Sequence, residues 1–173
     1  GGSQGARVFA DEFPQIFKKL KESKIKIKVY QQCHHSQNDQ LYQFYKKPQI
    51  YFEIFNFTSK IIDYYSKSNL VITRSGASVL GELLNFKIPF IAIPLPTSAD
   101  NHQYKNAVFY TKRGYGNFLE EKDIKNKLYD LIVSTFNDKS ISNSILLKQQ
   151  QHSDKDILKN LYSLIEKICN GKN

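Results

Sequence analysis

The sequence predicts an α/β fold, a Rossmann-like doubly wound parallel sheet that lacks its first strand, and three observations lead to this prediction. Short apolar runs rich in β-branched residues alternate along the chain with longer segments of helical periodicity, as in successive βαβ units. Leu70, Val71 and Ile72 form one such run, which is typical of a strand covered on both faces. The glycine-rich residues 1–6 open the sequence without the strand that normally precedes such a turn, so we expect a fragment of a longer protein.

The first half of the chain is expected to alternate between helix and strand. Phe13, Phe17 and Leu20 share one side of the first predicted helix, in which Pro14 predicts a kink or a later start. Alternating Ile, Lys and Val residues predict a half-buried strand after it. The expected elements are a helix over residues 7–21, a strand over 25–30, a short helix over 37–45, a strand over 50–55, and a helix over 60–67 with Ser59 as its N-cap.

The second half is expected to continue this alternation and to end in helices. The expected elements are a strand over residues 70–72, a small-residue turn over 74–78, a helix over 79–86, a strand over 90–93, a rigid loop over 94–100, a helix over 102–112, a strand over 114–119, and helices from residue 120 onward, over 142–150 and over 154–169. The last helix carries a continuous apolar stripe. We interpret this stripe as core contact, with a membrane or partner helix as the alternative.

Length and composition place the chain among ordinary globular proteins. It has 173 residues, enough for one domain with a hydrophobic core, and we treat residues 1–173 as that domain. No apolar run is long enough to cross a bilayer, and the first residues lack the regions of a signal peptide. We therefore expect a cytosolic protein or a peripheral one.

The formal net charge is +9, and nearly all of the positive charge comes from lysine. Such a balance could attract a phosphate-rich ligand, nucleic acid or an anionic membrane surface. No dense basic tract interleaved with aromatic residues accompanies it. We therefore expect no nucleic-acid binding and keep an anionic membrane surface as an alternative partner.

The cysteines and histidines do not form a recognisable metal or redox motif. Cys33 and Cys169 are far apart in the sequence, which predicts reduced thiols. Cys33, His34 and His35 are consecutive, but adjacent side chains cannot all turn toward one ion without contortion. We therefore predict a loop at the binding edge of the sheet and no metal site.

Residues 69–82 read as a strand, a small-residue turn and a helix, and this arrangement suits a nucleotide. The amides in the first turn of the helix would point out of the carboxyl end of the sheet, where a diphosphate could accept their hydrogen bonds. Glu82 follows about one turn later, at the depth where a carboxylate could hold both hydroxyls of a ribose. An ordinary βα unit with a small-residue turn is the alternative that this segment alone leaves open.

Three connections are expected at the same edge of the sheet. In a doubly wound fold, ligands bind beyond the carboxyl ends of the strands. The turns at residues 1–6 and 75–78 and the loop at 94–103 all fall there, and His102, Gln103 and Asn106 lie in the first turn of the helix that follows. Several polar side chains at this position favour the hydrogen-bonding set of a sugar or base. Together they favour the nucleotide interpretation.

Three motifs resemble, in the same order and at compatible separations, the carboxyl-terminal half of the MurG family. They are GGSQGA at residues 1–6, RSGAS followed by GE within residues 74–82, and IPLPTSADNHQYKNA at residues 93–107. The family comprises bacterial transferases that add N-acetylglucosamine to the lipid-linked muramyl-pentapeptide precursor of peptidoglycan. The resemblance covers essentially the whole chain. It implies one half of a GT-B glycosyltransferase of the family 28 type, holding the donor UDP-N-acetylglucosamine.

The resemblance implies a role for each motif in binding the donor. Ser3 would contact the diphosphate, the turn and helix start after residue 75 would cradle the phosphates, and Glu82 would accept from the ribose hydroxyls. His102 and Gln103 would contact the sugar. Thr58 falls where the family presents a residue whose backbone reads the uracil edge, a position that is commonly aliphatic. The implied donor-binding residues are Ser3, Thr58, Gly76, Ala77, Ser78, Val79, Leu80, Gly81, Glu82, His102, Gln103 and, in support of the sugar contacts, Asn106.

Two departures from the family pattern bear on activity. Val79 stands where a threonine is usual, so a hydroxyl that could bond a phosphate oxygen is lost, typically on the order of 1 kcal/mol. The family also carries an amino-terminal domain with a second glycine-rich loop, a histidine proposed as general base, and the acceptor and membrane contacts, none of which is in this sequence. We therefore expect donor binding without turnover, and no catalytic residue, metal or cofactor in this chain.

The resemblance also implies a cellular setting and leaves alternatives. Its partners would be UDP-N-acetylglucosamine and, through the missing domain, a lipid-linked acceptor. The protein would act on the cytoplasmic face of the plasma membrane as a peripheral enzyme of peptidoglycan and cell wall biogenesis, with effects on cell shape and division. One alternative is a related glycolipid transferase with another acceptor. Another is a non-catalytic nucleotide-sugar-binding subunit of a two-chain transferase.

Overall fold

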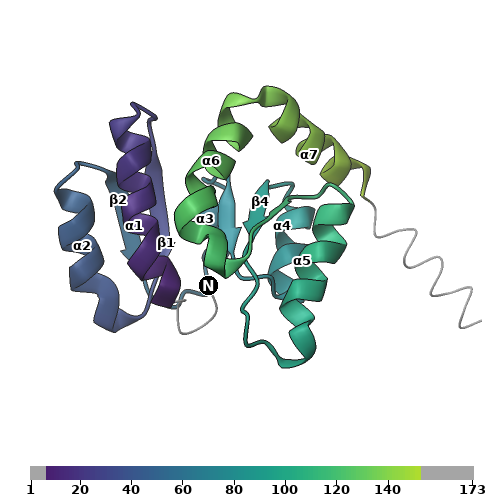
Figure 1. The fold of residues 1–173 in the computed structure, drawn as a ribbon, viewed down its shortest axis with the longest axis horizontal. Helices are drawn as coiled ribbons and strands as arrows, with labels where there is room; N and C mark the ends of the chain where they lie inside the picture. Colours follow the sequence, from purple (N-terminus) through teal and green to yellow (C-terminus); the bar gives the residue numbers. More distant parts are fainter. Residues whose placement is uncertain (1–6, 153–173) are drawn as a thin grey trace, which may run out of the picture.

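The computed structural model describes residues 7–152, which form parallel strands with helices on both faces (Figure 1). The helices and strands are, in chain order, α1 (Arg7–Glu22), β1 (Lys28–Gln32), α2 (Asn38–Lys46), β2 (Tyr51–Phe55), α3 (Ile61–Tyr65), β3 (Val71–Thr73), α4 (Ala77–Asn85), β4 (Phe90–Ala92), α5 (His102–Lys112), β5 (Asn117–Phe118), α6 (Ile124–Asn137) and α7 (Lys139–Gln151). Short 3-10 turns at His35–Gln37, Ala99–Asn101 and Glu121–Asp123 lead into α2, α5 and α6. The alternation of elements and the parallel pairing of every strand confirm the predicted α/β class.

The strands of residues 7–152 form two sheets and not one continuous sheet. β1 pairs with β2, with Val29 opposite Phe52. The second sheet has the order β3-β4-β5, with Ile72 opposite Ile91. β1 and β3 are therefore outer strands, and they do not pair with each other. The doubly wound sheet expected from the sequence is therefore interrupted between β1 and β3.

Helices cover the strands from two sides. Phe90 packs with residues of α3, α4 and α5 in one core cluster, whereas Ile91 packs with residues of α1 and α6 in another. Because successive side chains of a strand point to opposite faces, these two groups of helices lie on opposite faces of the second sheet. A third cluster joins α1 and α2 to β1 through Val29 and Leu41. Figure 1 shows α1 and α6 side by side, one in front of each sheet.

Helix α1 illustrates how burial shapes an element that the sequence predicts only in outline. Phe9, Phe13, Ile16 and Leu20 are buried at helical spacing, and Phe9 and Phe13 stack with ring centroids 4.5 Å apart. The helix starts at Arg7 and continues through Pro14, so the predicted later start is wrong. Burial of this apolar face compensates for the hydrogen bond that a proline within a helix cannot donate.

Most predicted elements are present, and their limits differ by a few residues. Helix α4 begins two residues earlier than expected, and the strand expected over residues 114–119 is confined to Asn117–Phe118. Ser59 is not the N-cap of α3: Lys60 occupies that position, and its N–H donates to Thr58 Oγ1 at 3.0 Å. The helix predicted over residues 154–169 lies outside the described residues. Within residues 7–152, no helix combines the length and apolar character needed to cross a bilayer.

Candidate functional site

The site residues predicted after β3 and β4 lie at the carboxyl ends of these strands. β3 leads through Arg74, Ser75 and Gly76 into α4, and β4 leads through residues 93–101 into α5. Because the strands are parallel, both connections emerge at one edge of the sheet. A cavity of about 640 Å³ extends from this edge between the two sheets, and its lining there includes Gln103 and the start of α4.

The amino-terminal turn of α4 presents free backbone donors at this edge. Gly76 is the N-cap, and the first backbone hydrogen bond of the helix runs from Leu80 N–H to the Gly76 carbonyl at 3.1 Å. The amides of Ala77, Ser78 and Val79 precede this bond and therefore have no acceptor within the helix. Ala77 and Ser78 are exposed. Oriented amides and the helix dipole make such a terminus suitable for an anionic group.

Gly76, the last residue of the small-residue turn before α4, has an extended backbone conformation. Its φ of −65° and ψ of 142° are extended values that any residue can adopt. A Cβ atom built on Gly76 would meet only Val79 Cγ1, at an ordinary 3.7 Å. Neither the backbone conformation nor the space around Gly76 therefore requires glycine at this position.

Three polar side chains of α5 brace the connections around the site. Asn106 Nδ2 donates to the Ser75 carbonyl at 3.0 Å, which ties α5 to the turn before α4. Gln103 Oε1 accepts from Leu95 N–H at 3.0 Å, and His102 Nδ1 bonds the Ala99 carbonyl at 2.8 Å. Gln103 and Asn106 are half-buried, and His102 is exposed. The structure thus brings together the two loops that the sequence placed on one edge.

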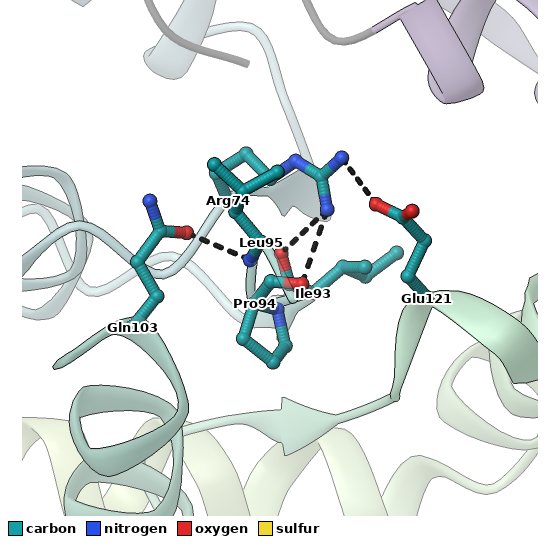
Figure 2. Close-up of polar contacts among 6 residues, drawn as sticks. All are labelled: Arg74, Ile93, Pro94, Leu95, Gln103 and Glu121. Atoms are coloured by element: carbon teal, nitrogen blue, oxygen red, sulfur yellow. Dashed lines mark hydrogen bonds and ion pairs between the residues drawn. The ribbon is translucent and has the colours of Figure 1, made fainter. Parts of the chain in front are cut away.

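Arg74 holds the second of these loops from the other side (Figure 2). Its Nη1 donates to the Pro94 carbonyl at 3.1 Å and approaches the Ile93 carbonyl at 3.5 Å, while Nη2 forms an ion pair with Glu121. The Arg74 side chain is only 12% exposed, and its guanidinium lies 4.8 Å from the centroid of the Phe9 ring. One largely buried cation therefore links α1, the end of β3, the loop after β4 and the turn before α6.

Glu82 lies on the exposed side of α4, in its second turn. Its carboxylate is near Tyr65 of α3, whose pKa is raised to about 12, first by burial and second by the charge of Glu82. Tyr65 therefore stays protonated at neutral pH. Glu82 is thus an exposed carboxylate in the turn of α4 that follows the free amides.

The remaining predicted positions lie inside α4, at the connection after β2, or outside the described residues. The Leu80 side chain is fully buried in the core and its amide is bonded, so its contribution is packing. Gly81 lies within α4, with room for a Cβ next to Tyr110 Oη at 3.5 Å. Thr58 follows β2, and its hydroxyl oxygen accepts from Lys60 N–H. Ser3 lies outside the described residues.

The consecutive cysteine and histidines form a capped turn after β1. His34 is the N-cap of the 3-10 turn His35–Gln37, accepts from Ser36 N–H, and donates its own N–H to Gln37 Oε1 at 3.0 Å. Cys33 is buried, and burial raises the pKa of its thiol. Among residues 7–152, no group of three His, Cys, Asp or Glu side chains could hold a metal ion.

Sequence reasoning missed the structural role of Arg74 and its partner Glu121. The sequence indicates Arg74 only as part of a small-residue turn and of the RSGAS motif, and Glu121 only as part of the helical region that starts at residue 120. A signal was present, because an arginine directly after a buried strand is close to the core and needs acceptors. Its two carbonyl acceptors are 19 and 20 residues away in the sequence and Glu121 is farther still, so their identity required the structure.

Comparison with known proteins connects this geometry to a family. The glycosyltransferase family 28 C-terminal domain matches residues 1–161. A curated relative from Pelagibacter ubique (strain HTCC1062), named UDP-N-acetylglucosamine--N-acetylmuramyl-(pentapeptide) pyrophosphoryl-undecaprenol N-acetylglucosamine transferase, is 41% identical over 73% of this chain and 35% of its own length. A relative with the same name from Rickettsia canadensis (strain McKiel) is 35% identical over 97% of this chain and 48% of its own length.

A solved structure shares the fold. The crystal structure of Acinetobacter baumannii MurG superposes with a TM-score of 0.78 and 22% sequence identity, over 96% of this chain and 48% of that chain. This chain therefore spans half or less of the length of each of these proteins. Because the family domain covers nearly all of the chain, the protein belongs to glycosyltransferase family 28, of which it contains the C-terminal domain.

Proposed function

We propose that this chain is the donor-binding half of an inverting hexosyltransferase that transfers N-acetylglucosamine from UDP-N-acetylglucosamine to lipid-linked muramyl-pentapeptide. The observation that supports this most is the hydrogen bond from Asn106 to the Ser75 carbonyl. It holds the free amides of α4 against the first turn of α5, so that the groups we assign to the diphosphate and to the sugar share one edge. The names of the relatives, each a transferase that uses this donor, support the same assignment.

The proposed division of labour follows from the chemistry of each group. The amides of Ala77, Ser78 and Val79 would bind the diphosphate and stabilise the charge that develops on the departing UDP. Glu82 would accept hydrogen bonds from the ribose hydroxyls. Gln103 uses its Oε1 to hold Leu95 N–H, which leaves its amide Nε2 as a donor toward a sugar hydroxyl or acetamido oxygen.

We propose that the chain binds the donor without turnover. Inverting transfer needs a base that deprotonates the acceptor hydroxyl. The histidine at this edge of the sheet is His102, in the first turn of α5. Its Nδ1 is already hydrogen-bonded to the Ala99 carbonyl. We assign it to donor binding, and we propose that the base, the lipid-linked acceptor and the contacts with the cytoplasmic face of the membrane belong to another part of the longer protein. The cellular roles in cell wall biogenesis, cell shape and division follow from this assignment.

The donor assignment can be tested by titrating the 173-residue chain with UDP-N-acetylglucosamine, UDP-glucose and a GDP-sugar in a calorimeter. We expect UDP-N-acetylglucosamine to bind most tightly and Glu82→Ala to weaken it more than tenfold, because hydrogen bonds to a charged acceptor contribute about 1.5–3 kcal/mol. Glu82 is exposed and alanine favours helices, so the variant should fold normally.

Glu22→Ala is the matched control for this titration. Glu22 is an exposed glutamate at the last position of α1, at the end of that helix opposite to the site. Its replacement should leave the dissociation constant unchanged. Equal binding of UDP- and GDP-sugars, or equal effects of the two substitutions, would contradict the donor assignment. A preference for UDP-glucose would favour a related transferase with another sugar.

A further inference from the structure

The chain enters α5 through two consecutive residues in the left-handed backbone region. Asp100 has φ 48° and ψ 23°, and Asn101, the N-cap of α5, has φ 54° and ψ 28°. Residues with a side chain visit this region at an energetic cost and usually singly, and asparagine and aspartate tolerate it best. The sequence therefore places a suitable pair of residues at a strained point, directly ahead of His102 and Gln103.

The other left-handed residues of the described chain end helices. Among residues 7–152, the other non-glycine residues with positive φ are Lys24, Gln49 and Lys87. At each of them, two backbone hydrogen bonds close the preceding helix in the pattern of a Schellman turn, as where Lys24 N–H donates to the Lys21 carbonyl at 2.9 Å. Asp100 and Asn101 precede a helix, so helix termination does not explain their conformation.

Main-chain bonds hold the pair in place, and its side chains take no part. Asn101 N–H donates to the Ser98 carbonyl at 3.0 Å, and His102 N–H donates to the Ala99 carbonyl. Asp100 and Asn101 are exposed, and neither side chain has a hydrogen bond or an ion pair with another residue of the described range 7–152. The contribution of the pair is therefore the direction that it gives to the backbone.

The pair lies in a loop whose two ends are joined by Gln103. Leu95 N–H donates to Gln103 Oε1 at 3.0 Å, as Figure 2 shows, and Ser98 N–H donates to the Leu95 carbonyl at 3.1 Å. Gln103 follows Asn101 by two residues, so a rotation at either left-handed residue would displace its side chain relative to Leu95. Because the carboxamide is planar, the hydrogen bond to Oε1 also fixes the direction of the Nε2 donor.

The ring of His102 is fixed by the same turn. A carbonyl can only accept, so the 2.8 Å contact between His102 Nδ1 and the Ala99 carbonyl places the ring proton on Nδ1. The neutral imidazole then has Nε2 as a hydrogen-bond acceptor. The two residues after the pair therefore offer an acceptor, His102 Nε2, and a donor, Gln103 Nε2. A sugar hydroxyl can use both, because it donates one hydrogen bond and accepts others.

We propose that Asp100 and Asn101 are positioning residues for sugar recognition. Their left-handed backbone directs the first turn of α5 so that His102 and Gln103 present these two groups to the sugar of the donor. The identity of this ligand rests on the proposed function. The groups that we assign to the diphosphate and the ribose lie on α4, which precedes the pair in the chain. The pair therefore controls the affinity gained from the sugar and not the affinity for UDP.

Two substitutions at Asn101 separate backbone conformation from side-chain contact. Asn101→Val disfavours the left-handed region, because a β-branched side chain is poorly tolerated there, whereas Asn101→Gly adopts it freely. In the 173-residue chain without ligand, we expect Asn101→Val to speed amide hydrogen exchange at Leu95 on the order of tenfold. In calorimetric titrations, its preference for UDP-N-acetylglucosamine over UDP should fall roughly tenfold. Asn101→Gly should keep both values within about twofold of the unsubstituted chain.

Gln49→Val is the matched control. Gln49 is exposed and left-handed like Asn101, but it connects α2 to β2 of the other sheet, so its replacement should lower thermal stability and leave both readouts unchanged. Unchanged values for Asn101→Val, or the same changes with Gln49→Val, would overturn the proposal. Equal losses for Asn101→Gly and Asn101→Val would also overturn it, because they would assign the effect to the Asn101 side chain. Faster Leu95 exchange in Asn101→Val, in a chain that does not bind UDP-N-acetylglucosamine, would support the positioning of Gln103 and contradict only the donor assignment.

Discussion

The Arg74 guanidinium makes the contacts that shape the loop carrying Leu95, and Leu95 N–H in turn fixes the Gln103 side chain. A planar fork can donate to two carbonyls and a carboxylate at once, which a lysine ammonium on its flexible stem cannot reproduce. Because Arg74 is nearly buried, the loss of its contacts leaves Glu121 and two carbonyls without their partner. The geometry of the loop between β4 and α5 therefore depends on one side chain that has no assigned ligand contact in the proposed site.

We expect Arg74→Lys to lower the free energy of unfolding by about 1.5–3 kcal/mol and to weaken UDP-N-acetylglucosamine binding through a looser loop. Urea unfolding and calorimetric titration measure the two effects. Arg113→Lys is the matched control, since Arg113 is exposed and its described contacts are with Phe109 of the same helix, the carbonyl and the ring. If both substitutions had the same small effect, the proposed role of Arg74 would be excluded.

At this scale the sequence predicted which residues gather at the edge, but not what several of them bind. Gln103 and Asn106 lie at the predicted place, yet they hold the Leu95 amide and the Ser75 carbonyl. Residue type and motif order indicate a polar cluster, whereas its partners depend on which loops meet. Two other predicted binding residues have structural explanations of their own. The backbone at Gly76 does not require glycine, and the Leu80 side chain belongs to the hydrophobic core.

At the scale of elements, the contact between β4 and the start of β5 depends on a missing side chain. A Cβ atom on Gly116 would lie 2.5 to 2.8 Å from three atoms of the Phe90 ring, well inside normal contact. Phe90 is fully buried, so its ring has little room to move. The chain therefore needs glycine just before β5 for steric reasons, although Gly116 has no special φ value.

We expect Gly116→Ala to destabilise the fold by about 1–3 kcal/mol through overpacking against Phe90. Gly81→Ala is the comparison, because its Cβ would meet only Tyr110 Oη at 3.5 Å inside α4, where alanine is favoured by up to about 1 kcal/mol. Thermal unfolding followed by circular dichroism should therefore shift down for the first variant and not for the second. A normal melting temperature for Gly116→Ala would show that the Phe90 ring relocates without cost.

Over the whole molecule, α1 and α6 connect the two sheets. Leu128 of α6 is fully buried in a cluster that also contains Phe13 of α1 and Ile91 of β4. α1 also packs on β1 through Ala10, so the first sheet is held to the second mainly through helices and not through strand pairing. The stability of the whole fold should therefore be sensitive to this helix contact.

We expect Leu128→Ala to cost about 2–5 kcal/mol, as is usual for a large buried side chain replaced by alanine. Leu147→Ala on α7 is the matched control, because Leu147 is 56% exposed and should cost far less. Urea denaturation followed by circular dichroism measures both. Similar losses for the two variants would mean that the α1–α6 contact is not the main link between the sheets.

The sequence by itself determined the order of helices and strands, their parallel arrangement, and the family, because periodicity, turn residues and motif spacing are local properties of the chain. Only the tertiary structure decided that β1 and β3 stand apart, that Arg74 reaches the loop 20 residues away, and that Asn106 bonds a carbonyl 31 residues away. The physical reason is that these contacts form between distant segments. Their geometry follows from how the helices pack and not from any local pattern.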